Sequence, residues 1–134
     1  MLIDETMTSW LLLAGRIALA SVFLASGIHK GVWYQKAVEE FKIDRIPLIG
    51  LTLPVTIALH LLGSICLILG YQTQIAALLL AVLTVAATLK VHRFWRLPKA
   101  ERLGRSRVAN ANLAIVGGLL VLAATGPGAI ALVP

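Results

Sequence analysis

The sequence has little charge, few aromatic residues and a single cysteine. Charged residues make up 13% of its 134 residues and aromatic residues 6%, whereas hydrophobic residues reach 59%. A soluble globular domain carries about 25% charged and about 45–50% apolar residues, so a soluble chain of this size could not bury so much apolar surface. Cys66 stands alone in a Leu/Ile run, which excludes an internal disulfide or a Cys-x-x-Cys couple. The composition therefore indicates an integral membrane protein.

Acidic residues are absent from the long apolar runs. The six carboxylates belong to Asp4, Glu5, Glu39, Glu40, Asp44 and Glu101. This distribution disfavours a proton-driven carrier that works through a buried carboxylate. The sequence also lacks a P-loop, a metal-ligand cluster, a nucleophile elbow and a dinucleotide fingerprint. We therefore expect no metal site and no catalytic residue.

Four apolar runs are each long enough to cross a bilayer, which takes about 20 helical residues. They cover residues 10–28, 49–69, 74–91 and 108–125. No Lys or Arg precedes the first run, so we expect no cleavable signal and a retained first span. Residues 34–41 form an amphipathic segment that is typical of a surface helix. The sequence predicts an all-α fold, with one domain over residues 1–134: an antiparallel four-helix transmembrane bundle with a short amphipathic surface helix in the first loop.

Basic residues gather in the first and third loops and at their edges. Of the twelve Lys and Arg residues, Arg16 alone lies well inside a span, and Lys90 lies at the edge of the third loop. The positive-inside rule then places both loops in the cytoplasm and both termini on the periplasmic or extracellular side of a bacterial cytoplasmic membrane. The basic residues are confined to two loops beside long apolar runs and form no aromatic-interleaved face of the kind that binds nucleic acid, so we exclude nucleic acid as a partner. The third loop instead predicts a docking surface for an acidic protein or anionic lipid, made by Arg93, Arg96, Lys99, Arg102, Arg105 and Arg107.

Two ionisable residues fall inside the spans, where charge is costly and commonly functional. At 1.5 Å per residue, Arg16 and His60 lie within about 5–6 Å of each other in depth, so the two could border one polar cavity. Arg16 would anchor an anionic or carbonyl-bearing ligand, and His60 would donate a hydrogen bond to a quinone carbonyl. The alternatives are structural: Arg16 snorkels or binds carbonyl groups of another helix, and His60 makes an interhelical hydrogen bond.

Further polar residues mark the cytoplasmic ends of the spans. Lys30, His92 and Asn112 would shape the inner part of the cavity, although snorkelling also accounts for the lysine. Haem between His29 and His92 is disfavoured, because both lie at span ends without a haem motif. Small residues form stripes that predict close helix packing: Ala14, Ala18, Ser21 and Ala25 in the first span, and Ala114, Gly117, Gly118 and Ala124 in the fourth.

The order of these segments resembles the DoxX family of small four-helix bacterial membrane proteins. The resemblance rests on Arg16, LASGIHK at 24–30, LLGSICLILGYQTQIAALLL at 61–80, His92, NLAIVGGLLVL at 112–122 and GPG at 126–128. The resemblance implies a membrane subunit linked to redox and quinone chemistry. Arg16, Lys30, His92 and Asn112 match the family pattern, whereas His60 stands about where members often carry a glutamate.

The leading hypothesis is therefore a quinone-interacting or anchoring membrane subunit of a respiratory-type oxidoreductase complex. The chain has no recognisable redox centre, so a redox protein partner would supply one. The first alternative is a non-catalytic anchor or assembly factor that docks a soluble partner through the basic third loop. The second is a small-solute transporter working as a homodimer, which the lack of an inverted repeat disfavours.

Overall fold

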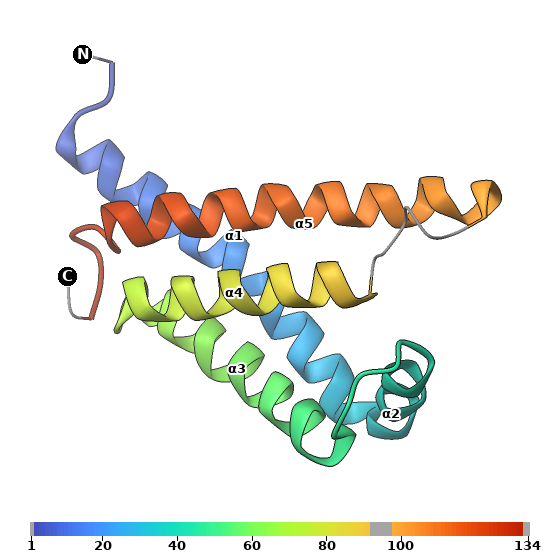
Figure 1. Ribbon diagram of the computed structural model, residues 1–134. Helices are drawn as coiled ribbons and strands as arrows, with labels where there is room; N and C mark the ends of the chain where they lie inside the picture. Colours follow the sequence, from blue (N-terminus) through green and yellow to red (C-terminus); the bar gives the residue numbers. More distant parts are fainter. Residues whose placement is uncertain (1, 92–97, 133–134) are drawn as a thin grey trace.

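The protein is an all-α bundle, seen in a computed structural model that describes residues 2–91 and 98–132 (Figure 1). The predicted fold class is confirmed, and the predicted surface helix is present. Four helices are long and apolar enough to cross a membrane: α1, α3, α4 and α5. The elements are α1 (Glu5–Val32), α2 (Tyr34–Ile43), α3 (Ile49–Leu69), α4 (Thr73–Val91) and α5 (Lys99–Thr125).

Helix ends follow from local chemistry. Asp4 caps α1, because its side-chain oxygen accepts a hydrogen bond from the Met7 backbone N–H at 2.8 Å. Gly70 ends α3 in the left-handed conformation, with φ of 73°, where glycine has no Cβ to clash. Gly126, with φ of 80°, ends α5 and is followed by Pro127. The glycine at the end of α3 allows the tight turn into α4. The glycine and proline after α5 allow the last described residues to reverse direction.

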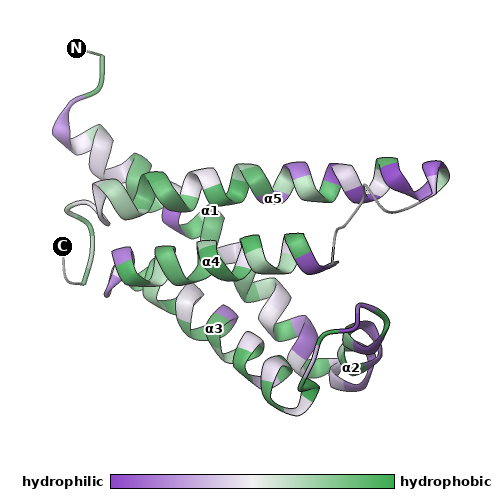
Figure 2. Ribbon diagram, viewed as in Figure 1, coloured by the Kyte–Doolittle hydropathy of each residue, from purple (hydrophilic) through white to green (hydrophobic). Residues whose placement is uncertain are grey.

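Two helices are longer than their apolar runs. The first helix begins at Glu5 rather than near residue 10, and α5 begins at Lys99 rather than near residue 108. A hydropathy window detects only the apolar part of a helix, whereas helical hydrogen bonding continues into the polar flanks. Figure 2 shows hydrophilic residues on α2 and on the first turns of α5, with apolar residues along the middle of the long helices.

Packing is uneven around the bundle. The first helix packs mainly against α3, α4 packs mainly against α5, and α3 and α4 form the connecting hairpin, whereas α1 and α5 meet over a short stretch. We call the end that carries both termini and the α3–α4 turn the terminal end, and the opposite end the α2 end (Figure 1). A buried cluster joins α1, α3, α4 and α5, formed by Ala20, Phe23, Leu67, Ala76, Ala77, Leu80, Ala81, Leu119 and Leu122.

Most of the predicted small-residue stripes do not pack within the chain. In α1, Ala14, Ala18, Ser21 and Ala25 are all exposed, and in α5 only Gly118 approaches another helix, at Leu19. The prediction was wrong because the face of α1 that carries Arg16 turns inward. A stripe that begins two residues earlier lies about 200° away around the helix. The small residues that do allow close packing include Ala20 and Gly27.

Candidate functional site

Arg16 is buried at the terminal end and binds the segment that follows α5. Its side chain is 1% exposed. Nη1 donates a hydrogen bond to the carbonyl oxygen of Pro127 at 3.1 Å, and Nη2 donates one to the carbonyl oxygen of Ile130 at 2.7 Å. Its buried Nε has no hydrogen-bond partner within the described residues. The structure thus favours the alternative in which Arg16 binds backbone carbonyl groups, here those of a tail rather than of a helix.

His60 lies on α3 and faces α1. The centroids of the Phe23 and His60 rings are 5.5 Å apart, with an angle of 56° between the ring planes. Gly27 makes this close approach possible, because a Cβ added there would lie 3.1 Å from the Cβ of His60 and 2.9 Å from Leu61. The Nδ1 atom of His60 is buried and finds no hydrogen-bond partner in residues 2–91 or 98–132. A buried imidazole nitrogen without a partner is uncommon in proteins and needs an explanation.

Lys30 lies one helical turn beyond Gly27 on the same face of α1. Its Nζ donates a hydrogen bond to the Ser26 hydroxyl oxygen at 2.6 Å. The ammonium group also interacts electrostatically with Glu40 on α2 and with His60 on α3. Groups on α2 and α3 are therefore within electrostatic range of this cationic group, on the side of His60 towards the α2 end. We call Ser26, Lys30 and His60 the α1–α3 polar cluster.

Arg16 and His60 do not share one cavity. Arg16 lies against Gly70 at the end of α3, since a Cβ built on Gly70 would come within 2.6 Å of Nη1. His60 is ten residues earlier in α3, which places it about 15 Å further along the helix. The expected offset of about 5–6 Å in depth was wrong. The error arose because α1 begins earlier than its apolar run, so Arg16 reaches the level of the α3–α4 turn.

Asn112 connects α5 to α4. Its Nδ2 donates a hydrogen bond to the Thr88 hydroxyl oxygen at 3.0 Å, and that hydroxyl donates to the carbonyl oxygen of Thr84 at 2.7 Å. Asn110, two residues earlier, is exposed. One asparagine of the pair therefore faces inward, and it contacts α4 rather than the α1–α3 polar cluster. His92, which we expected near this depth, lies outside the described residues.

The described part of the predicted basic docking surface lies at the start of α5. Arg93 and Arg96 fall outside the described residues, so the structure places only part of the predicted docking surface. The remaining members lie on the first nine residues of α5, a length of about 14 Å: Lys99, Arg102, Arg105 and Arg107. This stretch extends past the end of α4 (Figure 1).

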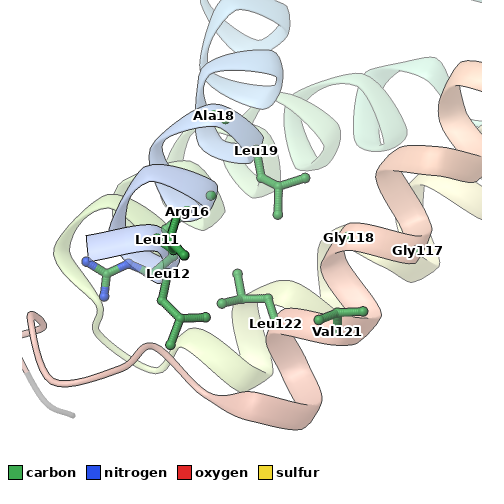
Figure 3. Close-up of a pocket in the computed structure, with 10 residues that line it drawn as sticks. Leu11, Leu12, Arg16, Ala18, Leu19, Gly117, Gly118, Val121 and Leu122 are labelled. Atoms are coloured by element: carbon green, nitrogen blue, oxygen red, sulfur yellow. The ribbon is translucent and has the colours of Figure 1, made fainter. Parts of the chain in front are cut away.

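An apolar groove separates α1 from α5 near the terminal end. It has a volume of about 430 Å³. Figure 3 shows leucine side chains from α1 and α5 pointing into it, while the guanidinium group of Arg16 points away from it. The groove is lined by Leu11, Leu12, Gly15, Arg16, Ala18, Leu19, Gly117, Gly118, Val121 and Leu122. It contains none of the α1–α3 polar cluster, so the groove and the cluster are separate features.

Sequence reasoning missed several partners. Ser26 and Thr88 carry only hydroxyl groups, which a search for ionisable residues passes over. The carbonyl groups of Pro127 and Ile130 belong to the backbone and leave no side-chain signal. The Gly-Pro-Gly sequence at 126–128 was the one available signal, because it allows the chain to reverse after α5. Among the described residues, no three His, Cys, Asp or Glu side chains form a group that could hold a metal ion.

The chain is similar to three curated proteins over most of its length. It is 32% identical to the inner membrane protein YqjF of Escherichia coli over 117 residues, which cover 87% of this chain and 85% of YqjF. It is 28% identical to the inner membrane protein YphA of the same organism over 123 residues, covering 91% and 87%. It is 26% identical to the ER-derived vesicles protein ERV29 of Saccharomyces cerevisiae, covering 93% of this chain but only 33% of that longer relative.

The comparison with solved structures finds no match. The family model DoxX matches residues 11–93, from the second turn of α1 to the residues after α4. Four apolar helices and two inner membrane relatives agree on a multi-pass protein of the bacterial inner membrane. By its match to the family model, this chain belongs to the DoxX family.

Proposed function

We propose that the chain is a membrane subunit that binds a quinone-type carbonyl ligand at the α1–α3 polar cluster, within an oxidoreductase complex whose redox centre belongs to a partner. The observation that carries the proposal is the buried Nδ1 of His60, which lacks a partner within the described part of the chain. An ionisable residue within a membrane span is expected to serve a ligand, an ion pathway or a defined partner. Among residues 2–91 and 98–132, no group hydrogen-bonds this nitrogen to account for its place.

Comparison with the other inward polar residues singles out His60. Arg16 uses two of its nitrogen atoms on backbone carbonyl groups, and Asn112 bonds Thr88. These two residues have structural roles that explain why the membrane interior tolerates them. Of the expected ligand positions that the structure describes, His60 and Lys30 therefore remain as the core of the proposed site.

The side chains around His60 suit a flat ligand with a carbonyl group. An imidazole N–H can donate a hydrogen bond to a carbonyl oxygen, and Phe23 presents an aromatic surface beside it. The Lys30 ammonium lies close enough to interact with His60 electrostatically. A fixed cation in a low-dielectric site stabilises negative charge that develops on a carbonyl oxygen during reduction.

The test is the quinone content of the purified protein. The chain would be purified in a mild detergent from quinone-containing membranes, and the extracted lipids would be analysed by mass spectrometry. We expect about one quinone per chain or per complex, its loss in His60→Phe and its retention in Ser64→Ala. Ser64 is a matched control, because it is a buried polar residue of α3 that bonds only its own helix. Quinone-free wild-type protein, or equal quinone in His60→Phe and wild type, would contradict the proposal.

A second candidate is a membrane anchor that docks an acidic soluble partner. The observation in its favour is the basic start of α5, which extends past α4 away from the apolar part of the bundle (Figure 2). We place this end in the cytoplasm, following the distribution of basic residues. Charge reversal at Lys99 and Arg107 would then abolish recovery of the partner, while His60→Phe would leave it unchanged. The converse result would favour the quinone site alone.

A further inference from the structure

The residues that follow α5 form a strap across the terminal end of the bundle. Residues 126–132 reverse direction after α5 and return over the α3–α4 turn (Figure 1). The backbone N–H of Leu132 donates a hydrogen bond to the carbonyl oxygen of Leu69 at 2.7 Å. We call residues 126–132 the C-terminal strap. Its end is thus fixed to the last turn of α3, and its beginning is continuous with α5.

The C-terminal strap packs so closely against α1 and α3 that two of its contact positions leave no room for a side chain larger than glycine. A Cβ built on Gly70 would lie 2.4 Å from the Cβ of Ala131, and one built on Gly128 would lie 2.9 Å from Leu12. Both glycines also have positive φ, 73° and 85°. The strap therefore contacts α3 at Gly70 and α1 at Leu12 in an arrangement that only glycine accommodates at both positions.

Arg16 ties the strap to α1. The hydrogen bonds to Pro127 and Ile130 cross from α1 to the chain beyond α5, and they join the two helices that have little direct contact with each other. The same two helices form the walls of the apolar groove, which both Leu12 and Arg16 help to line. The separation of α1 and α5 at the terminal end thus depends on an electrostatic tie more than on side-chain packing.

We propose that the C-terminal strap is a latch that sets the separation of α1 and α5, and that its release widens the apolar groove, whose walls are already partly exposed. The latch is held by the Arg16 hydrogen bonds, by the hydrogen bond from Leu132 to Leu69 and by the packing at Gly70 and Gly128. None of these residues belongs to the buried cluster, so the latch can open without unpacking that cluster. An arginine freed from these carbonyl groups must find new partners, because an unpaired charge within the membrane is costly. The latch therefore has a closed and an open arrangement rather than a continuous range.

The test measures the distance across the groove. Spin labels would be placed at Leu11→Cys and Val121→Cys in a Cys66→Ala background, since Leu11 and Val121 are exposed residues on opposite walls. Pulsed electron resonance in lipid nanodiscs would give the distribution of distances. We expect one narrow distribution with the strap intact. In Arg16→Gln we expect a second population of molecules with a longer distance between the labels. Its share relative to the short-distance population should be at least about tenfold higher than in the protein with Arg16, since a hydrogen bond from a charged donor is worth about 1.5 kcal/mol or more.

Two further variants act on the strap without touching Arg16. Leu132→Pro removes the N–H that bonds Leu69, and Gly128→Ala places a methyl group against Leu12. Both should raise the longer population, whereas removal of residues 133–134 alone should not. Gly50→Ala is the matched control for the glycine change, because a Cβ there meets nothing within 4 Å.

An unchanged, narrow distribution in Arg16→Gln and Leu132→Pro, with normal helical circular dichroism and a monodisperse profile, would overturn the latch. If Arg16→Gln fails to fold, the decision falls to Leu132→Pro, which keeps the buried charge paired. The outcome is independent of the proposed quinone site, since no residue of the α1–α3 polar cluster is changed.

Discussion

Nη2 of Arg16 donates a hydrogen bond to the carbonyl oxygen of Ile130 at 2.7 Å, across 114 residues of chain. An arginine in the first span of a membrane protein is thereby bound to the last residues of the described chain. The Arg16 side chain is almost wholly buried, and its charge is met by backbone dipoles rather than by a carboxylate. The contact explains how an apolar helix with no acidic neighbour can retain a cation.

The contact predicts a large loss of stability on removal of the charge. In Arg16→Met, the carbonyl groups of Pro127 and Ile130 would lose their donors, at a cost of about 1.5–3 kcal/mol for each hydrogen bond from a charged group. The melting temperature in detergent, followed by circular dichroism, should fall well below that of the wild type. Arg107→Met, at an exposed position of α5, is the control and should melt close to the wild type. Equal melting of both variants would contradict a stabilising role for Arg16.

Gly27 predicts a difference between two glycine substitutions in one helix. Alanine favours a helix over glycine by about 1 kcal/mol at both Gly27 and Gly31. At Gly31 a Cβ meets nothing within 4 Å, whereas at Gly27 it would press on Leu61 and His60. We expect Gly31→Ala to be neutral or stabilising and Gly27→Ala to be less stable than it by about 1–3 kcal/mol, the usual cost of overpacking. Unfolding free energies in the same detergent would show this, and equal values would refute close packing of α1 on α3.

The fold could be predicted from sequence because the bilayer dictates its elements. Runs of about 20 apolar residues separated by charged loops leave few alternatives to spanning helices. The predicted bounds of α3 and α4 agree closely with the structure, since Gly70 and the tight turn after it separate the two helices. Those of α1 and α5 do not, because Glu5 and Lys99 continue helices into polar sequence that hydropathy does not detect. The prediction of which face of α1 packs inward was wrong as well, because the small-residue stripe lies on the opposite side of the helix from Arg16.

The candidate site was only partly predictable. His60, Lys30, Arg16 and Asn112 stand out in sequence because polar groups are costly in a membrane. The structure turns His60, Arg16 and Asn112 towards other elements, whereas Lys30 bonds Ser26 of its own helix. Their partners could not be predicted, because two are backbone carbonyl groups and one is a threonine on another helix. Assigning depth by counting residues also failed, since helix tilt and extra turns shift one span against another. The ligand roles of these residues remain proposals that the experiments above test.

Asn112 predicts a small, specific coupling between α4 and α5. Interhelical hydrogen bonds in membranes average about 0.6 kcal/mol, with a maximum near 1.7 kcal/mol. A double-mutant cycle of Asn112→Leu and Thr88→Val should give a coupling energy in that range. The same cycle with the exposed neighbour, Asn110→Leu and Thr88→Val, should give a value near zero. A coupling for Asn112 no larger than that for Asn110 would show that the hydrogen bond does not stabilise the folded bundle.

The distribution of basic residues predicts which end of the bundle faces the cytoplasm, and single cysteines can test it. In a Cys66→Ala background, Tyr71→Cys reports on the α3–α4 turn and Lys36→Cys reports on α2; both positions are exposed. The positive-inside rule places the turn outside, so a membrane-impermeant maleimide should label Tyr71→Cys in intact cells and Lys36→Cys only after permeabilisation. The reverse pattern would put the C-terminal strap and Arg16 at the cytoplasmic end. It would also remove the basic start of α5 from any soluble cytoplasmic partner, leaving the quinone proposal unaffected and the anchor proposal untenable.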